Sequence, residues 1–104
     1  MEMINNGENL IVELSGEIDH HSLIELRGVI DARLEQYTPG VLLLDFSKVS
    51  FMDSSGIGLI LGRKRIAESY GGKVVIRNAA GSVEKMIKLA GLGFMIASNK
   101  GAGK

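Results

Sequence analysis

Apolar and polar residues change their spacing several times along the chain, and each change predicts a different element of secondary structure. Residues 10–14 form an apolar, partly β-branched run that ends at Ser15 and Gly16, and Ile18 follows alone among polar residues. This pattern predicts a strand, a turn and a short second strand.

The spacing of apolar residues then becomes three or four, which predicts a helix. Ser22 is the expected N-cap, with Glu25 three residues later, and the helix is expected to end near Tyr37. The next three residues, Thr-Pro-Gly, break it. One apolar stripe runs along the helix and consists of Leu23, Leu26, Ile30 and Leu34.

A continuous apolar run at residues 41–46 predicts a strand that is covered on both faces and lies centrally in a sheet. The turn at residues 53–56 is expected to open a second helix that reaches Tyr70 and stops at two glycines. The remaining expected elements are a strand at 73–77, a third helix at about 82–90 and a short last strand at 94–97.

Strands that alternate with helices predict an α/β domain, because parallel neighbouring strands need a crossover connection. We expect a mostly parallel or mixed sheet of four to five strands with three helices packed on it. The whole chain, residues 1–104, is expected to form one domain with an ordered core at about 9–97. Residues 98–104 carry no large apolar side chain and are expected to form a flexible tail.

Composition removes several classes of function. The 12 basic and 12 acidic residues cancel, so the chain lacks the positive field that nucleic acid binding requires. The absence of cysteine excludes disulfides, thiolate catalysis and cysteine-bound zinc. Residues 1–7 do not resemble a secretory signal, and no apolar run approaches the roughly 20 residues that span a membrane. We therefore expect a soluble cytoplasmic protein without membrane partners.

The two serines at the start of the second helix are the first candidate for chemistry. Ser54 and Ser55 follow Asp53 where a strand gives way to a helix, and the positive end of the helix dipole tolerates a phosphate there. An ordinary N-cap, in which a serine oxygen accepts a backbone N–H, explains the same residues. Spacing alone leaves both explanations open.

The second helix also contains Gly58 and Gly62 at interior positions, each about 0.8–1 kcal/mol less favourable than alanine. The two glycines lie on one side of the helix and leave a bare strip near the serines. One explanation is that another chain approaches this strip. The other is close packing of the helix on its own sheet.

The same helix has two apolar stripes, although only one needs to face the sheet. If the second stripe is uncovered, it forms an exposed patch beside the serines that marks a partner site. The first stripe is Ile57, Ile60, Leu61 and Ala67, and the second is Leu59, Ile66 and Tyr70.

Four catalytic or ligand-binding interpretations are disfavoured, and we do not expect an enzyme. Residues 17–21 hold two carboxylates and two histidines, but adjacent histidines point in different directions, so no metal site is expected. A hydrolase elbow needs a glycine two residues before the serine, where Met52 and Asp53 stand instead. The dinucleotide fingerprint fails because Leu61 replaces its third glycine. Solvated helix and strand ends, rather than a phosphate cradle, are expected for Arg63, Lys64, Arg65 and Lys73.

Two segments together resemble a known family. GEIDHH at residues 16–21 and FMDSSGIGLILGR at residues 51–63 resemble the anti-sigma factor antagonists, which are STAS-domain proteins. The likeness runs from about Leu10 to Ile96, and its details resemble the sporulation subtype. Members generally continue into a further terminal helix, which is expected to be shortened or absent here.

This resemblance implies a partner-switching cycle. The unphosphorylated protein would bind an anti-sigma factor that is itself a serine kinase, and so release a sigma factor. Phosphorylation of Ser54 would end binding, and a serine phosphatase would reverse it. ATP and magnesium would belong to the kinase, so this chain needs no cofactor. The partner-binding residues implied are Asp19, His20, Asp53, Ser55, Gly56, Ile57, Gly58 and Leu61.

A second class of function remains open from the sequence. STAS modules also serve as structural or transport-associated subunits that are not phosphorylated at this position. Treatment with an anti-sigma factor kinase separates the two classes, because only an antagonist would gain a phosphoryl group.

Overall fold

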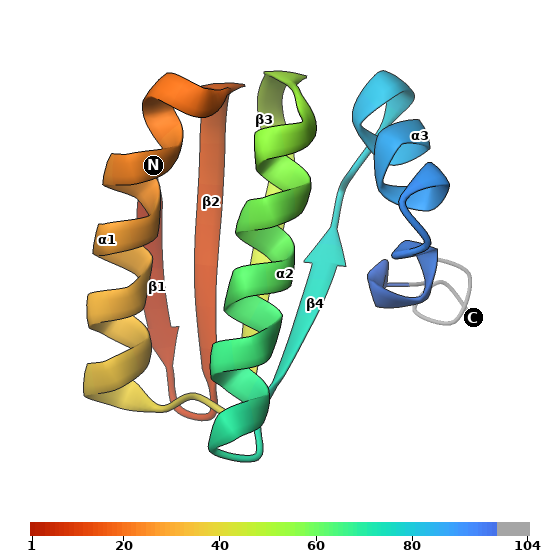
Figure 1. Ribbon diagram of the computed structural model, residues 1–104. Coiled ribbons are helices and arrows are strands. Elements are labelled where there is room, and N and C mark those ends of the chain that lie inside the picture. Colours follow the sequence, from red (N-terminus) through yellow and green to blue (C-terminus); the bar gives the residue numbers. More distant parts are fainter. Residues whose placement is uncertain (98–104) are drawn as a thin grey trace.

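The computed structural model describes residues 1–97, and the expected tail at 98–104 and any terminal helix there lie outside the described residues. One sheet has the strand order β1-β2-β3-β4 (Figure 1). β1 is antiparallel to β2, whereas β2, β3 and β4 are parallel, so the expected mixed α/β fold is confirmed. The strands are β1 (Glu2–Asn6), β2 (Asn9–Ile18), β3 (Val41–Met52) and β4 (Lys73–Arg77).

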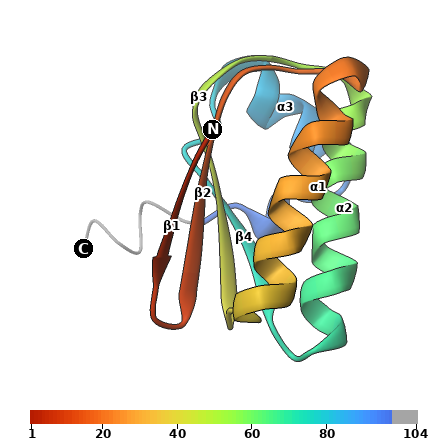
Figure 2. The same ribbon diagram turned by 90° about the vertical axis from the view of Figure 1, so that its left-hand side faces the viewer.

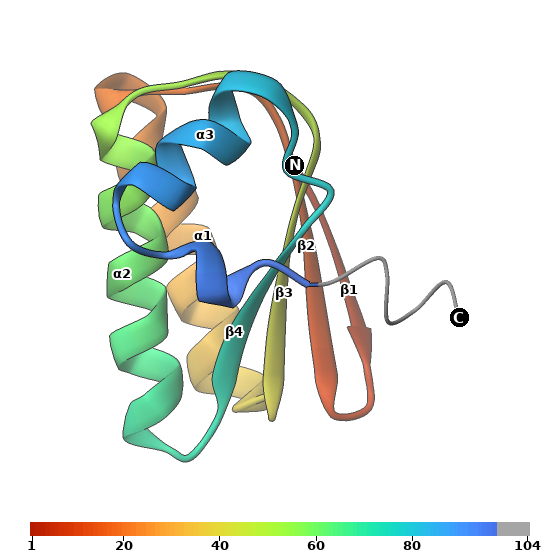
Figure 3. The ribbon, with the colours of Figure 1, turned by 90° about the vertical axis from the view of Figure 1, so that its right-hand side faces the viewer.

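The helices lie on one face of this sheet (Figure 2). α1 and α2 run side by side across the face, and α3 lies on the same side near β4 (Figure 3). A short 3-10 helix, η1, follows α3. The bounds are α1 (His20–Tyr37), α2 (Ser54–Ser69), α3 (Gly81–Leu89) and η1 (Gly93–Met95).

Alternation along the strands places one set of apolar side chains against the helices. Alternate residues are buried in β4, in residues 10–14 of β2 and in the first part of β3, while their neighbours on the opposite face are only partly covered. The exception is Asp45 of β3, which is buried between Leu44 and Phe46. The central position of β3 is confirmed, but its expected cover on both faces is wrong, because no helix of residues 1–97 lies on the second face (Figure 2). The buried residues of these strands include Leu10, Val12, Leu14, Leu42, Leu44, Val74 and Ile76.

Several boundaries differ from those expected. β1 was not predicted, and β2 is one strand through Ile18, with register shifts instead of a turn. β3 extends to Met52, beyond the apolar run. The expected last strand is replaced by η1, and only Ile96 forms a bridge, to Ile76.

Arg63 lies in the interior and not in solvent, which corrects the expectation for this residue. It is 4% exposed, and its Nε lies 2.8 Å from Asp31 Oδ1 of α1, an ion pair whose angle does not meet hydrogen-bond geometry. Burial lowers the pKa of the guanidinium, and the charge of Asp31 opposes that shift. The pair therefore links the two long helices, with the guanidinium buried and the carboxylate partly exposed.

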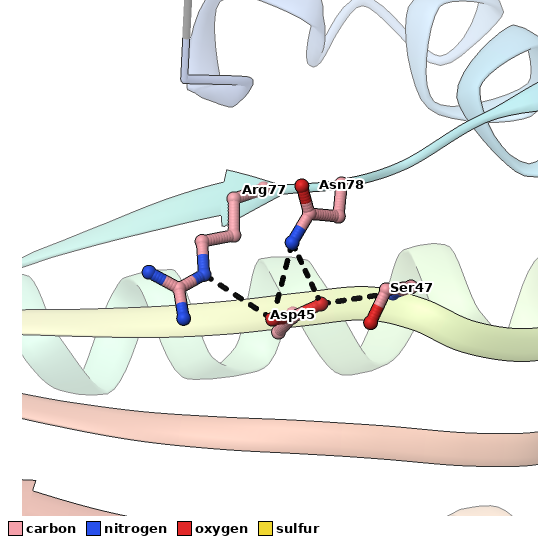
Figure 4. A network of polar contacts seen from close by, with 4 residues as sticks. All are labelled: Asp45, Ser47, Arg77 and Asn78. Carbon is pink, nitrogen blue, oxygen red and sulfur yellow. Dashed lines mark hydrogen bonds and ion pairs between the residues drawn. The ribbon is translucent and has the colours of Figure 1, made fainter. Parts of the chain in front are cut away.

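A buried carboxylate within β3 joins this strand to the end of β4 (Figure 4). Asp45 accepts hydrogen bonds from the Ser47 N–H at 2.9 Å and from the Asn78 amide and Arg77 Nε at 3.2 Å. Burial raises the pKa of the Asp45 carboxyl, but these hydrogen bonds lower it by more, so the pKa lies below its ordinary value. The network therefore favours the charged carboxylate in the folded state.

We expect Asp45→Asn to destabilise the protein at pH 7 by about 1–3 kcal/mol and by less near pH 3. The depressed pKa of Asp45 means that its stabilising effect is present above the unfolded-state value of about 3.9 and is lost as the pH falls through the folded-state value. Urea unfolding at the two pH values measures the difference. Glu2→Gln, on the exposed end of β1, is the control and should change stability little. An equal loss at both pH values would show that the carboxylate charge is not responsible.

Candidate functional site

The amino-terminal ends of α1 and α2 meet at one edge of the sheet, at the top of Figure 1. β2 and β3 are parallel, so both end at this edge and each leads directly into a helix. The Asp53 N–H donates a hydrogen bond of 3.1 Å to the Ile18 carbonyl oxygen. This bond holds the turn before α2 against the turn before α1.

Asp19 is the N-cap of α1, three residues earlier than expected. Its Oδ1 accepts a hydrogen bond from the Ser22 N–H at 2.9 Å, and the Ser22 hydroxyl accepts one from the Asp19 N–H at 3.1 Å. Ser22 is thus the second member of a capping box and not the N-cap. The backbone hydrogen bond from Ser22 lowers the pKa of the Asp19 carboxyl, whose negative charge therefore persists at this edge.

Asp53 begins α2 in the same way and leaves the first serine free. Its Oδ1 accepts a hydrogen bond from the Ser55 N–H at 2.8 Å, and its carbonyl accepts one from the Gly56 N–H at 2.9 Å. Ser54 is the first residue of α2 and is exposed. Among residues 1–97, its hydroxyl has no hydrogen-bond partner. The N-cap is therefore the aspartate, so capping does not explain Ser54.

Gly56 is buried for a steric reason. A Cβ added at Gly56 would lie 2.3 Å from both Cγ and Sδ of Met52, the last residue of β3. The glycine thus allows the first turn of α2 to pack directly on the end of the strand. Its contribution to the site is to position the neighbouring serines.

Gly58 and Gly62 do not pack closely on the sheet, so that explanation of the bare strip is wrong. A Cβ added at either position would meet no atom of the described residues within 4 Å, apart from the backbone of its own helix. Gly58 is exposed, and Gly62 is half-buried. The cost of both glycines in α2 is therefore not offset by contacts within residues 1–97.

The hypothesis that the second stripe of α2 forms an exposed patch is also wrong. Leu59 is only 1% exposed, and Ile66 and Tyr70 are partly buried against the core. α2 packs against α1 and against β3 and β4 of the sheet, and α3 lies beside only the upper part of α2 in Figure 1. The exposed apolar residue of α2 is instead Leu61, at 42%.

The remaining predicted residues lie on or near the same edge. His20 is exposed in the first turn of α1, and Ile57 is half-buried in the first turn of α2. Phe51, two residues before Asp53, is 49% exposed and was not predicted as part of the site. The sequence contains one signal that could have identified it: the buried apolar run is predicted to end at residue 46, and a large aromatic side chain is unexpected after that point.

Metal chemistry has no support from the arrangement of side chains. Within residues 1–97, no three or more histidine, aspartate or glutamate side chains gather as a metal ion requires. His20 and His21 are both exposed at the start of α1. What the edge offers is two capped helix ends, a free hydroxyl and an unfilled glycine strip.

This fold and the position of the motif agree with the family comparison, in which the STAS domain matches residues 1–101. The chain belongs to the STAS domain family. The STAS chain is 37% identical to the anti-sigma F factor antagonist of Lysinibacillus sphaericus over 89% of its own length and 79% of that protein. It is 34% identical to the anti-sigma F factor antagonist of Paenibacillus polymyxa, over 88% and 79% of the two chains.

A solved structure gives the same result in three dimensions. The anti-sigma factor antagonist SpoIIAA in its unphosphorylated form has a TM-score of 0.84 and 33% identity, over 97% of this STAS chain and 90% of that chain. The phosphorylated form of the Bacillus SpoIIAA has a TM-score of 0.75 and 32% identity, over 97% and 94%. None of the helices within residues 1–97 combines the length and the apolar composition that a membrane span requires.

We expect Gly56→Ala to destabilise the STAS chain and Gly58→Ala to stabilise it. The added methyl group at Gly56 overlaps Met52, and overpacking of this kind costs about 1–3 kcal/mol. At Gly58 the methyl group meets nothing, so the gain in helix propensity of about 0.8–1 kcal/mol remains. Urea unfolding of the two variants measures both effects. A Gly56→Ala protein as stable as Gly58→Ala would contradict the steric role of Gly56.

Proposed function

We propose that this protein is an anti-sigma factor antagonist whose binding to its anti-sigma factor is switched off by phosphorylation of Ser54. The observation that carries the proposal is the free, exposed hydroxyl of Ser54 beside a turn that Asp53 already caps. A kinase could therefore modify Ser54 without breaking a hydrogen bond of the fold. The relatives named as anti-sigma F factor antagonists support the same function.

The relatives also support a switch that leaves the fold intact. SpoIIAA is known in both the unphosphorylated and the phosphorylated form, and both resemble this chain closely. A phosphate at the first residue of α2 lies at the positive end of the helix dipole, which stabilises negative charge by about 0.3–1 kcal/mol. The modification is thus tolerated by the domain that carries it.

The effect on the partner is electrostatic. A phosphoserine at position 54 adds about −1.5 to −2 charges beside Asp53. Asp19 lies in the neighbouring turn, which the hydrogen bond from the Asp53 N–H to the Ile18 carbonyl holds against this one. Docking would then bury an unpaired anion against the partner. A penalty of about 3 kcal/mol weakens binding more than a hundredfold, which is enough for a switch.

The proposed partner surface spans the two helix starts. At α1, the surface includes the N-cap Asp19 and the first helical residue, His20. At α2, it includes the N-cap Asp53 and Ser55 in the first turn. From α2, the surface continues through Ile57, Gly58 and Leu61, while the buried Gly56 maintains its shape.

Each partner contributes one step of the cycle. The anti-sigma factor acts as the serine kinase and brings ATP and magnesium, and a serine phosphatase restores the free hydroxyl. No cofactor is assigned to this chain, which acts by binding and not by catalysis. The proposed location is the cytoplasm, where bacterial transcription takes place.

We expect incubation with an anti-sigma factor kinase and ATP to add one phosphoryl group, detected by intact mass spectrometry. Ser54→Ala should remain unmodified, and Ser55→Ala should still be modified, because the Ser55 N–H already serves the Asp53 cap and Ser54 alone is exposed. An unmodified wild-type protein would favour the alternative, a structural or transport-associated STAS subunit. Modification of Ser54→Ala would move the acceptor to another residue.

The binding consequence is measured with the same variants. Ser54→Asp should weaken binding to the anti-sigma factor by roughly a hundredfold, and Ser54→Ala should bind as the unmodified protein does. Binding of Ser54→Asp at full strength would refute the electrostatic explanation.

We expect Gly58→Ala to weaken binding to the anti-sigma factor roughly tenfold, although it stabilises the free protein. The methyl group would occupy the open strip that the partner approaches, at a cost of about 1–3 kcal/mol. Gly28→Ala is the matched control, because Gly28 also lies in a helix interior with no atom within 4 Å of an added Cβ. Isothermal titration calorimetry should show normal binding for Gly28→Ala. An equal loss of affinity in both variants would show that filling the glycine strip is not the cause.

A further inference from the structure

The ion pair between Arg63 and Asp31 is the polar contact that joins the two long helices. Among residues 1–97, no other ion pair and no side-chain hydrogen bond connects one helix to another. The remaining ion pairs of the helices each lie within one helix. Because α1 and α2 run side by side (Figure 1), Arg63 and Asp31 define one fixed point of contact between them.

Stability does not explain why a charge is buried at this point. Arg63 is 4% exposed, and burial lowers the pKa of its guanidinium more than Asp31 raises it, so the interior disfavours the charge. The positive charge of Arg27, on α1, acts in the same direction as burial. Arg63 Nη1 is buried without a hydrogen-bond partner among residues 1–97. Well-packed apolar side chains in place of such a pair are often equally stable or more stable, so the pair requires another explanation.

The pair supplies a directional contact that the apolar core does not. Apolar burial holds both helices on the sheet but is non-directional, whereas the ion pair joins two particular atoms at 2.8 Å. The flank of α2 with Gly58 and Gly62 offers no side chain that could interlock with a neighbouring helix. At the amino-terminal ends, the hydrogen bond from the Asp53 N–H to the Ile18 carbonyl oxygen holds the two turns together. This bond and the ion pair are two separate points, which together fix the angle between α1 and α2.

We propose that Arg63 is a positioning residue of the partner surface, because its ion pair with Asp31 sets the angle between α1 and α2. This inference rests on the function proposed above. Asp31 lies eleven residues after His20, and Arg63 lies nine residues after Ser54, so the pair is about 14–17 Å along the helices from their first residues. A change of about 10° in the angle would move Leu61, about 10 Å along α2, by roughly 2 Å relative to α1. A partner that contacts both helix starts and Leu61 would then lose shape complementarity.

Replacing both charges together tests the proposal, because a single substitution would leave the other charge unpaired. The double variant Asp31→Leu, Arg63→Met removes the ion pair and keeps apolar volume between the helices. Its urea unfolding midpoint should equal or exceed that of the wild type, whereas its affinity for the anti-sigma factor should fall roughly tenfold in calorimetric titration. Unchanged affinity would overturn the proposal, and so would a loss of affinity that is accompanied by a loss of stability.

The ion pair within α3 provides the matched control. The double variant Glu84→Gln, Lys88→Met removes an opposite-charge pair that joins no second element. This variant should bind the anti-sigma factor as the wild type does. A loss of affinity equal to that of the first double variant would overturn the proposal, because the loss of any ion pair would then be sufficient.

NMR residual dipolar couplings test the geometry without a partner. The couplings of the backbone N–H groups report the orientation of each helix relative to the sheet. In the variant Asp31→Leu, Arg63→Met, the angle between α1 and α2 should change, while the couplings of β2 and β3 remain those of the wild type. An unchanged angle would overturn the inference. A wild type that fails to bind an anti-sigma factor would instead contradict the proposed function, and the measured angle would still decide whether the pair positions the helices.

Discussion

The hydrogen bond from the Asp53 N–H to the Ile18 carbonyl oxygen is the contact on which the rest of the site depends. It joins the ends of two parallel strands at the point where each becomes a helix. Parallel pairing brings these ends to the same edge, and two aspartates, Asp19 and Asp53, then satisfy the first N–H groups of the two helices. Two short motifs that are distant in the sequence thereby form one surface.

Much of the architecture could be predicted from the sequence, because it depends on local spacing. β4 coincides with the predicted strand at residues 73–77, which follows two glycines and precedes polar residues. β3 is central in the sheet, as its continuous apolar run indicates. β1 has mostly exposed residues and pairs only with β2, so its sequence carries little burial signal. The start of α1 was misplaced because Asp19 and Ser22 are both good caps, and only the hydrogen bonds distinguish a cap from the other member of its box.

The site was predicted less completely, for reasons of packing. Periodicity identifies two apolar stripes on α2 but not the neighbours that cover them, so the exposed residue of α2 proved to be Leu61 and not Leu59. The sequence around Arg63 indicates a surface charge, because it does not show that Asp31 of α1 lies close enough to form an ion pair with it. The sequence also cannot tell a glycine that packing requires from one that it does not. Gly56 is required by its contact with Met52, whereas no atom of residues 1–97 requires a glycine at position 58.

These two glycines separate the demands of folding from those of binding. The turn before α2 needs the aspartate cap and Gly56, and both are satisfied inside the domain. Ser54 and Gly58 contribute neither to the aspartate cap nor to the packing on Met52. Gly58 even makes α2 less stable than alanine would. A glycine that costs stability, although residues 1–97 leave room for a side chain there, points to a contact outside the domain. In the proposed switch, a charge added at Ser54 would change the surface that a partner meets, while the hydrogen bonds of the Asp53 cap would remain in place.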